Sequence, residues 1–208
     1  MRTRTHALVC GLAILLGSLV VPAVSRGQTT EPILKRGKNE IGIWGGGSVA
    51  ATPLIGTTSD FDFGLAALRY GRRLWENEAL SFDWTVDVVP LAILSLDRSP
   101  SSAGTEHDAV YGAGLAPIGF RISYDALDWC RPYFAASGGF LAFAERVPAA
   151  GAKFNFTYDF GVGAQIPLTA RTAATIGYSY YHISNGDIAD SNPGFDANLL
   201  YVGFSLFR

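Results

Sequence analysis

Cysteine is almost missing from this chain of 208 residues, which contains only Cys10 and Cys130. Cys10 lies in an N-terminal apolar run that we expect to be removed, so the mature chain has no pair of cysteines and no disulfide framework. An excess of one charge is also missing, since 16 Lys and Arg stand against 18 Asp and Glu. This balance gives no reason to expect a nucleic acid as a partner.

Long apolar runs are missing beyond the N-terminus. The longest one, residues 88–96, is interrupted by Ser95 and is far shorter than the roughly 20 residues that a membrane-spanning helix requires. The composition is nevertheless 49% hydrophobic and 12% aromatic, more apolar than a soluble surface requires. Because a closed β-barrel is the other structure that can span a membrane, we test the sequence for that pattern.

The N-terminus has the three parts of a secretory signal peptide. Residues 1–6 are basic, residues 7–21 are almost wholly apolar, and small residues follow at 22–25. We predict a signal peptide over residues 1–27, cleaved near 25–27. Residues 28–38 then form a periplasmic lead-in, and residues 39–208 form the folded domain. Cys10 lies too deep in the apolar run for a lipoprotein signal.

Apolar and polar residues alternate with a strict period of two in several segments. In residues 80–88 apolar residues interleave with Ser, Asp and Thr, and the same alternation runs through residues 154–166. Such a pattern is typical of a transmembrane strand with one face in lipid and the other in a polar interior.

The same pattern predicts an all-β fold, an eight-stranded antiparallel transmembrane β-barrel, closed, with a filled polar interior. A β-sandwich is the minor alternative. Charged residues that we expect to face inward are Asp83, Asp87, Arg121 and Asp159, as a paired network that holds the barrel rigid. The approximate strands are residues 40–50, 61–70, 80–94, 110–124, 131–143, 153–167, 171–184 and 196–207.

The connections suggest how the barrel is oriented. Short turns are predicted near 71–77, 125–130 and 167–170, and longer links elsewhere. In membrane barrels short turns lie in the periplasm and long loops outside the cell, so both ends of the domain should lie on the periplasmic side. Aromatic residues expected to form a girdle at that side are Tyr70, Trp75, Tyr124, Trp129 and Tyr133.

The segment from Tyr180 to Asp196 carries the residues with catalytic potential. His182 and Ser184 share a strand face, about 6.6 Å apart along the backbone. They continue the parity of the apolar positions, so they should point toward the membrane near its outer leaflet. Asp196 has the lipid-facing parity at the outer end of the last strand. Polar groups aimed at lipid are functional candidates, although ordinary loop residues would explain the same composition.

This segment resembles the lipid A 3-O-deacylases of the PagL type, acyl-ester (acyloxyacyl) hydrolases built on eight-stranded outer-membrane barrels. The resemblance rests on the motifs His182-Ile183-Ser184-Asn185 and Asn192-Pro193-Gly194, followed by Asp196, with weaker similarity at residues 114–121 and 131–133. It implies that Ser184 is the nucleophile, His182 its general base and Asp196 the acid that orients the imidazole.

The same resemblance implies that Asn192 helps to stabilise the oxyanion, with Asn185 in support, and that no metal or other cofactor is required. Two positions depart from the family pattern. The acid is commonly a glutamate, one methylene longer than Asp196, and Asp187 stands where a small residue would be more typical.

The implied function is that of a serine esterase of the outer membrane, exported through its signal peptide and acting on lipid A (lipopolysaccharide) in the outer leaflet. Two alternatives stay open. One is a small barrel without enzymatic activity, with a structural or adhesion role, and the other is an outer-membrane phospholipase. The sequence leaves the oligomeric state open, a homodimer included.

Overall fold

The structure is a computed structural model that describes residues 38–51, 54–58, 61–97 and 107–208. The predicted signal peptide and almost all of the lead-in lie outside these residues. Within the described ranges, no helix is long and apolar enough to cross a membrane.

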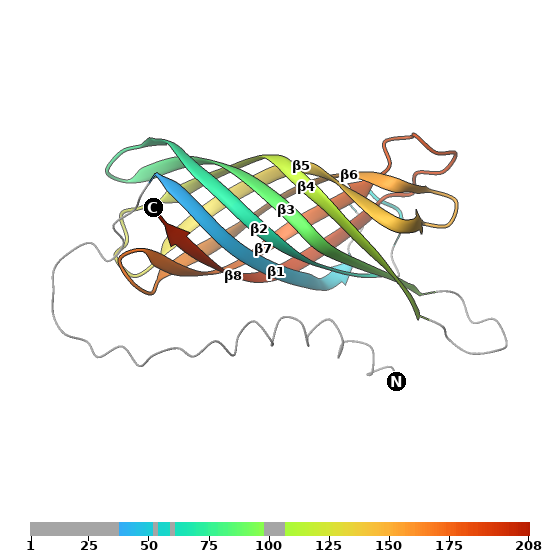
Figure 1. Ribbon diagram of the computed structural model, residues 1–208, viewed down its shortest axis with the longest axis horizontal. Helices are drawn as coiled ribbons and strands as arrows, with labels where there is room; N and C mark the ends of the chain where they lie inside the picture. Colours follow the sequence, from blue (N-terminus) through green and yellow to red (C-terminus); the bar gives the residue numbers. More distant parts are fainter. Residues whose placement is uncertain (1–37, 52–53, 59–60, 98–106) are drawn as a thin grey trace.

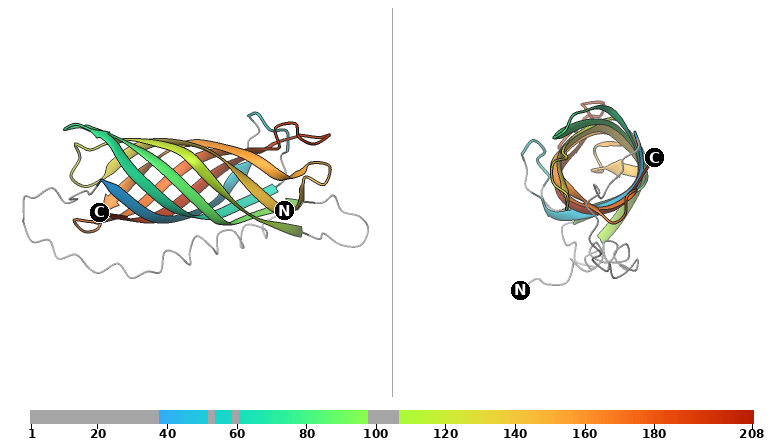
Figure 2. Two further views of the ribbon diagram at one scale, coloured as in Figure 1. Left: turned by 45° about the horizontal axis from the view of Figure 1, so that its top comes forward. Right: turned by 90° about the vertical axis from the view of Figure 1, so that its left-hand side faces the viewer.

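Eight strands form one closed antiparallel barrel, as predicted (Figure 1). Each strand pairs with its neighbours in the chain, and β1 pairs with β8 to close the ring, which Figure 2 shows end-on. The strands are β1 (Asn39–Ala51), β2 (Phe61–Glu76), β3 (Leu80–Asp97), β4 (His107–Tyr124), β5 (Arg131–Val147), β6 (Ala152–Pro167), β7 (Thr172–Ser184) and β8 (Phe195–Phe207).

All eight predicted strands are present, and the largest boundary difference is at β2. Residues 71–76, predicted to be part of a turn, continue the strand to Glu76. They do so because Arg73 lies opposite Asp83 on β3, and its Nε donates a hydrogen bond of 2.6 Å to Asp83 Oδ1. An inward arginine paired with an inward carboxylate extends the strand where the sequence alone suggested a polar turn.

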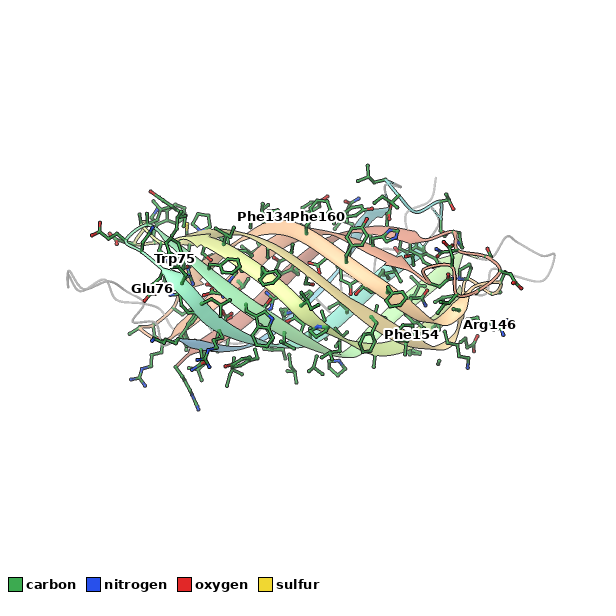
Figure 3. The ribbon with its side chains drawn as sticks, turned by 90° about the horizontal axis from the view of Figure 1, so that it is seen from above. Trp75, Glu76, Phe134, Arg146, Phe154 and Phe160 are labelled. Carbon is green, nitrogen blue, oxygen red and sulfur yellow. The ribbon has the colours of Figure 1, made fainter. Side chains whose placement is uncertain are left out.

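The two ends of the barrel differ. At the end where β1 begins and β8 ends, which we call the terminal end, Asn39 and Arg208 exchange two main-chain hydrogen bonds of 2.9 and 2.8 Å. The connections β2–β3, β4–β5 and β6–β7 also lie there (Figure 1). The other end, which we call the distal end, carries the β5–β6 connection and the link between β7 and β8. In Figure 3, Trp75 and Glu76 mark the terminal end and Arg146 marks the distal end.

The outer surface of the barrel is apolar along its length. Apolar side chains that are more than a third exposed there come from every strand, and Phe134, Phe154 and Phe160 are labelled in Figure 3. Such a band is what a barrel wall in lipid presents. Further members of the band are Ile43, Leu68, Val88, Ile118, Phe120, Phe156, Val162, Ile176, Leu200 and Phe204.

The interior of the terminal half is polar. Arg121, only 2% exposed, pairs with Glu40 and with Asp83, whose Oδ2 lies 2.9 Å from Arg121 Nη2. Nearer the middle of the barrel, Arg69 makes a two-pronged contact with Asp87 at 2.8 and 2.6 Å. These buried charges are paired, as expected of charges removed from water.

The interior of the distal half is apolar instead. Sixteen buried residues, Phe63, Leu94, Leu141, Ile183 and Leu199 among them, form one continuous cluster. The interior is therefore filled, as predicted, but polar side chains fill only part of it. Small side chains such as Ala92 and Ala197 allow the large ones from facing strands to interdigitate inside so narrow a barrel.

Tyr133 is the one predicted girdle residue that does not lie on the outer surface. It is 5% exposed, and its hydroxyl lies 2.8 Å from that of Tyr201 inside the barrel. The prediction failed because β5 is apolar on both faces, so its sequence does not reveal which face points inward. Tyr70, Trp75, Tyr124 and Trp129 are exposed, as expected.

We expect Arg121→Met to lower the free energy of unfolding by about 3 to 5 kcal/mol, because it leaves Glu40 without its buried counter-charge. Thermal unfolding in detergent micelles, followed by the mobility of unboiled protein on denaturing gels, measures the change. Arg72→Met, at an exposed position on the same barrel, is the control, and equal losses for the two variants would contradict the assignment.

Candidate active site

The site begins with a histidine and an aspartate on neighbouring strands at the distal end. His182 lies near the end of β7 and Asp196 near the start of β8, and the two are directly opposite each other in the strand pairing. Directly opposed residues place their side chains on the same face, within contact distance. His182 Nδ1 and Asp196 Oδ1 are 2.5 Å apart. The shorter acid therefore reaches the imidazole without any change of register.

This pair lies on the outer side of the barrel wall. His182 has the parity of Ile176 and Tyr178, which are 54% and 40% exposed, whereas its neighbour Ile183 belongs to the interior cluster. His182 itself is only 5% exposed. The ring of Tyr158, which faces it from β6, covers it with ring centroids 4.9 Å apart.

The second oxygen of Asp196 accepts hydrogen bonds from the main chain. The amides of Leu54, Ile55 and Gly56 donate to Oδ2 over 2.5, 2.7 and 2.9 Å. Their segment follows β1, and in Figure 2 it lies beside the link between β7 and β8. Asp196 is only 1% exposed, and burial of its charge without partners would be costly. The three amide donors offset that cost. Nothing in the sequence pointed to this contact.

Gly194 borders the other edge of the imidazole. A Cβ atom at this position would lie 3.1 Å from His182 Cε1 and 3.7 Å from Nε2, so a larger side chain would crowd the nitrogen that faces away from Asp196. The backbone there has a φ of 65°, which favours glycine. The Asn192-Pro193-Gly194 motif thus leaves space at Nε2.

The link between β7 and β8 is held together by two asparagines. Asn185, 1% exposed, donates from Nδ2 to the carbonyl of Ser191 over 2.7 Å and accepts the amide of Asp187 over 3.0 Å. Asn192 accepts the amide of Asn185 through its side-chain oxygen, at 2.9 Å. Asn185 therefore organises the loop in which Asn192 lies, which agrees with a supporting position.

Asp187 occupies a left-handed backbone conformation, with a φ of 62°. Its Oδ1 accepts a hydrogen bond of 3.1 Å from Asn192 Nδ2. Aspartate tolerates this conformation better than most residues do, and the Asn-Gly-Asp sequence is a turn signal. The carboxylate thus helps to orient the Asn192 amide. This contact between Asp187 and Asn192 was not predicted.

Ser184 is the last residue of β7, on the same side of the strand as His182. Its hydroxyl makes no hydrogen bond to any described residue, and therefore none to His182. A contact between a nucleophile and its base often tightens only when substrate is bound. The structure thus brings His182 and Asp196 into contact and places Ser184 next to them along the strand.

Comparison with known proteins assigns the chain to a family. The family model described as lipid A 3-O-deacylase (PagL) matches residues 60–205. The chain belongs to the PagL family. The match covers β2 to β8 and includes all five predicted site residues. A search of curated proteins gave no match.

Two solved structures are similar to the chain at low sequence identity, and the first of them shows the same fold. The crystal structure of the outer membrane enzyme PagL is 17% identical, with a TM-score of 0.52, and the match covers 79% of this chain and 97% of that one. Neisserial surface protein A (NspA) is 13% identical, with a TM-score of 0.49 and coverage of 82% and 97%.

In this member of the PagL family, two tyrosine hydroxyls next to the His182–Asp196 pair are buried. Tyr158 Oη and Tyr180 Oη have no hydrogen-bond partner among the described residues, and the two rings are 6.2 Å apart. Buried polar groups without partners are rare in proteins and often belong to functional sites.

We expect Asn185→Ala to loosen the β7–β8 link without unfolding the barrel, because two side-chain hydrogen bonds, each worth about 1 kcal/mol, are lost. Hydrogen exchange at the amides of Asp187 and Ile188 should become about 10- to 100-fold faster. Asp190→Ala, at an exposed position of the same link, is the control. Unchanged exchange in Asn185→Ala would contradict the organising role.

Proposed function

We propose that this protein is an outer-membrane serine esterase that hydrolyses a 3-O-linked acyl chain of lipid A and releases it as a fatty acid. The observation that carries the proposal is the 2.5 Å contact between His182 and Asp196, next to Ser184, in a chain of the lipid A 3-O-deacylase family.

The contact with Asp196 determines the tautomer of the histidine. An ionised carboxylate only accepts hydrogen bonds, so Nδ1 carries the proton and Nε2 is left as an acceptor. Nε2 can then take the proton from the Ser184 hydroxyl as Oγ attacks the acyl carbonyl carbon. Asp196 stabilises the imidazolium that results.

The tetrahedral intermediate then collapses. The bond between the acyl carbon and the 3-oxygen of the sugar breaks, and the imidazolium gives its proton to that oxygen, which leaves as a hydroxyl. A water molecule attacks the acyl-serine and passes a proton to Nε2, after which Ser184 recovers its proton and the fatty acid departs. Asn192 Nδ2, held by Asp187, stabilises the oxyanion in both steps.

Lipid A is the substrate that suits the position of these residues. The pair lies on the outer side of the wall at the distal end, beside an apolar surface. In an outer-membrane barrel the short turns lie in the periplasm, so this end would meet the outer leaflet, in which lipid A carries acyl esters. Export through the predicted signal peptide at residues 1–27 completes this proposal.

Ser184→Ala and His182→Ala should each lower deacylation by at least about 10³-fold, because nucleophile and base act as one unit. Mass spectrometry of lipid A after incubation with the purified barrel measures the loss of one 3-O-linked acyl chain. Ser191→Ala serves as a matched control, since only the carbonyl of Ser191 takes part in the hydrogen bonds of the link.

The same experiment separates the alternatives. Release of fatty acid from phospholipid in preference to lipid A would identify a phospholipase. Unchanged lipid A with the wild-type barrel in several detergents and lipid mixtures would leave only a structural or adhesion role.

Asn192→Ala should reduce kcat by about 10²- to 10³-fold with little change in KM, because an oxyanion donor acts mainly in the transition state. Steady-state release of fatty acid from lipid A measures both constants. A rise in KM at constant kcat would show instead that Asn192 binds the ground state.

A further inference from the structure

A chain segment outside the family match provides hydrogen-bond donors to Asp196. Residues 54–56 precede the matched range of 60–205, yet their three amides converge on one oxygen of Asp196 at 2.5 to 2.9 Å. Successive main-chain N–H groups that point at one oxygen form a small anion-binding concavity. The bound anion here is the side chain of the catalytic acid proposed above.

The segment is fixed to the start of β8 by further hydrogen bonds. The amide and hydroxyl of Thr57 both donate to the carbonyl of Pro193, at 2.6 and 2.9 Å. The amide of Thr58 donates to the carbonyl of Gly194 at 3.3 Å, and Thr58 forms a parallel bridge with Phe195. Residues 54–58 are therefore fixed against the link that carries the site and the first residue of β8.

Gly56 is the position at which this packing is tightest. A Cβ atom there would lie 2.8 to 2.9 Å from main-chain atoms of Gly194 and Phe195. Because these atoms belong to the backbone, they cannot rotate away as a side chain could. Any residue larger than glycine would push the segment off β8 and withdraw the amides from Asp196.

These contacts determine how the aspartate points. With Oδ2 held by three donors, Oδ1 faces His182 Nδ1, and the carboxylate has no freedom to turn about its last bond. We propose that residues 54–58 are a positioning element of the active site, whose amides hold Asp196 against His182 and allow the shorter acid to serve in this family. This inference rests on the proposed esterase function and adds a segment to its site.

The side chains of the segment act separately from its amides. Leu54 and Ile55 are 71% and 61% exposed, so their substitution by alanine leaves the three hydrogen bonds to Asp196 in place. The proposal therefore assigns the loss of kcat expected on disturbing the segment to the displacement of its main-chain amides.

Gly56→Ala tests the proposal in the full-length barrel. We expect kcat for fatty-acid release from lipid A to fall by roughly 10²-fold with KM little changed, since a small displacement of a reacting group costs about that much. Gly138→Ala is the matched control, because a Cβ atom there would meet no atom nearer than 3.9 Å. Gly56→Ala should cost less than about 3-fold when Asp196→Asn is already present, because the two changes act through the same contact.

A second readout does not depend on activity. The proton shared by His182 Nδ1 and Asp196 should give a far-downfield proton NMR signal in wild type and in Gly138→Ala, and the signal should vanish or move upfield in Gly56→Ala. If Gly56→Ala does not fold, Ile55→Pro removes one of the three donors instead. A wild-type barrel that shows this signal but leaves lipid A intact would refute the esterase function alone.

Three results would overturn the positioning role: an unchanged signal in Gly56→Ala, absence of the signal from wild type, or an equal fall in kcat with and without Asp196→Asn.

Discussion

Hydrogen bonding between the first and last strands is the constraint on which the rest of the structure depends. A barrel in lipid has no water to satisfy an open edge, so β1 must pair with β8 along its whole length. The observed pairing runs from Glu40 opposite Phe207 to Ala51 opposite Ala197. Because β1 ends beside the start of β8, the chain that leaves β1 passes Asp196. Closure of the sheet thus brings together parts of the site that are 140 residues apart in the sequence.

Most of the fold could be predicted because period-two alternation is strong where one face meets lipid and the other does not. The prediction was less accurate where both faces carry similar residues. On β5 the apolar character of both faces hid the inward orientation of Tyr133, and on β2 the stretch with the inward Arg73 looked like a turn. The apolar cluster in the distal half was missed for a related reason. Alternation distinguishes apolar from polar faces, and it is weak where the interior is apolar too.

The candidate site could also be predicted only in part. Side-chain parity and the family motif together pointed to His182, Ser184 and Asp196, and the opposed positions of His182 and Asp196 explain how the shorter acid reaches the imidazole. The amides of residues 54–56 could not be predicted, because every residue except proline carries the same N–H group. The carboxylate of Asp187 on Asn192 depends on a left-handed turn, which the sequence permits but does not specify.

The buried ion pairs of the interior and the candidate site lie in different parts of the barrel. The ion pairs of Arg121 and Arg69 lie toward the terminal end and the middle of the barrel, while the His182–Asp196 pair lies at the distal end on the outer side of the wall. The apolar cluster fills the lumen between them.

The contact between residues 54–56 and Asp196 has a consequence for biogenesis. It joins the two ends of the domain, so it forms only when the last strand has found the first, which is a late event because long-range contacts carry the largest chain entropy cost. Before β1 and β8 pair, Asp196 lacks these three donors and is not yet oriented toward His182. Closure of the barrel and orientation of the His182–Asp196 pair are then a single step.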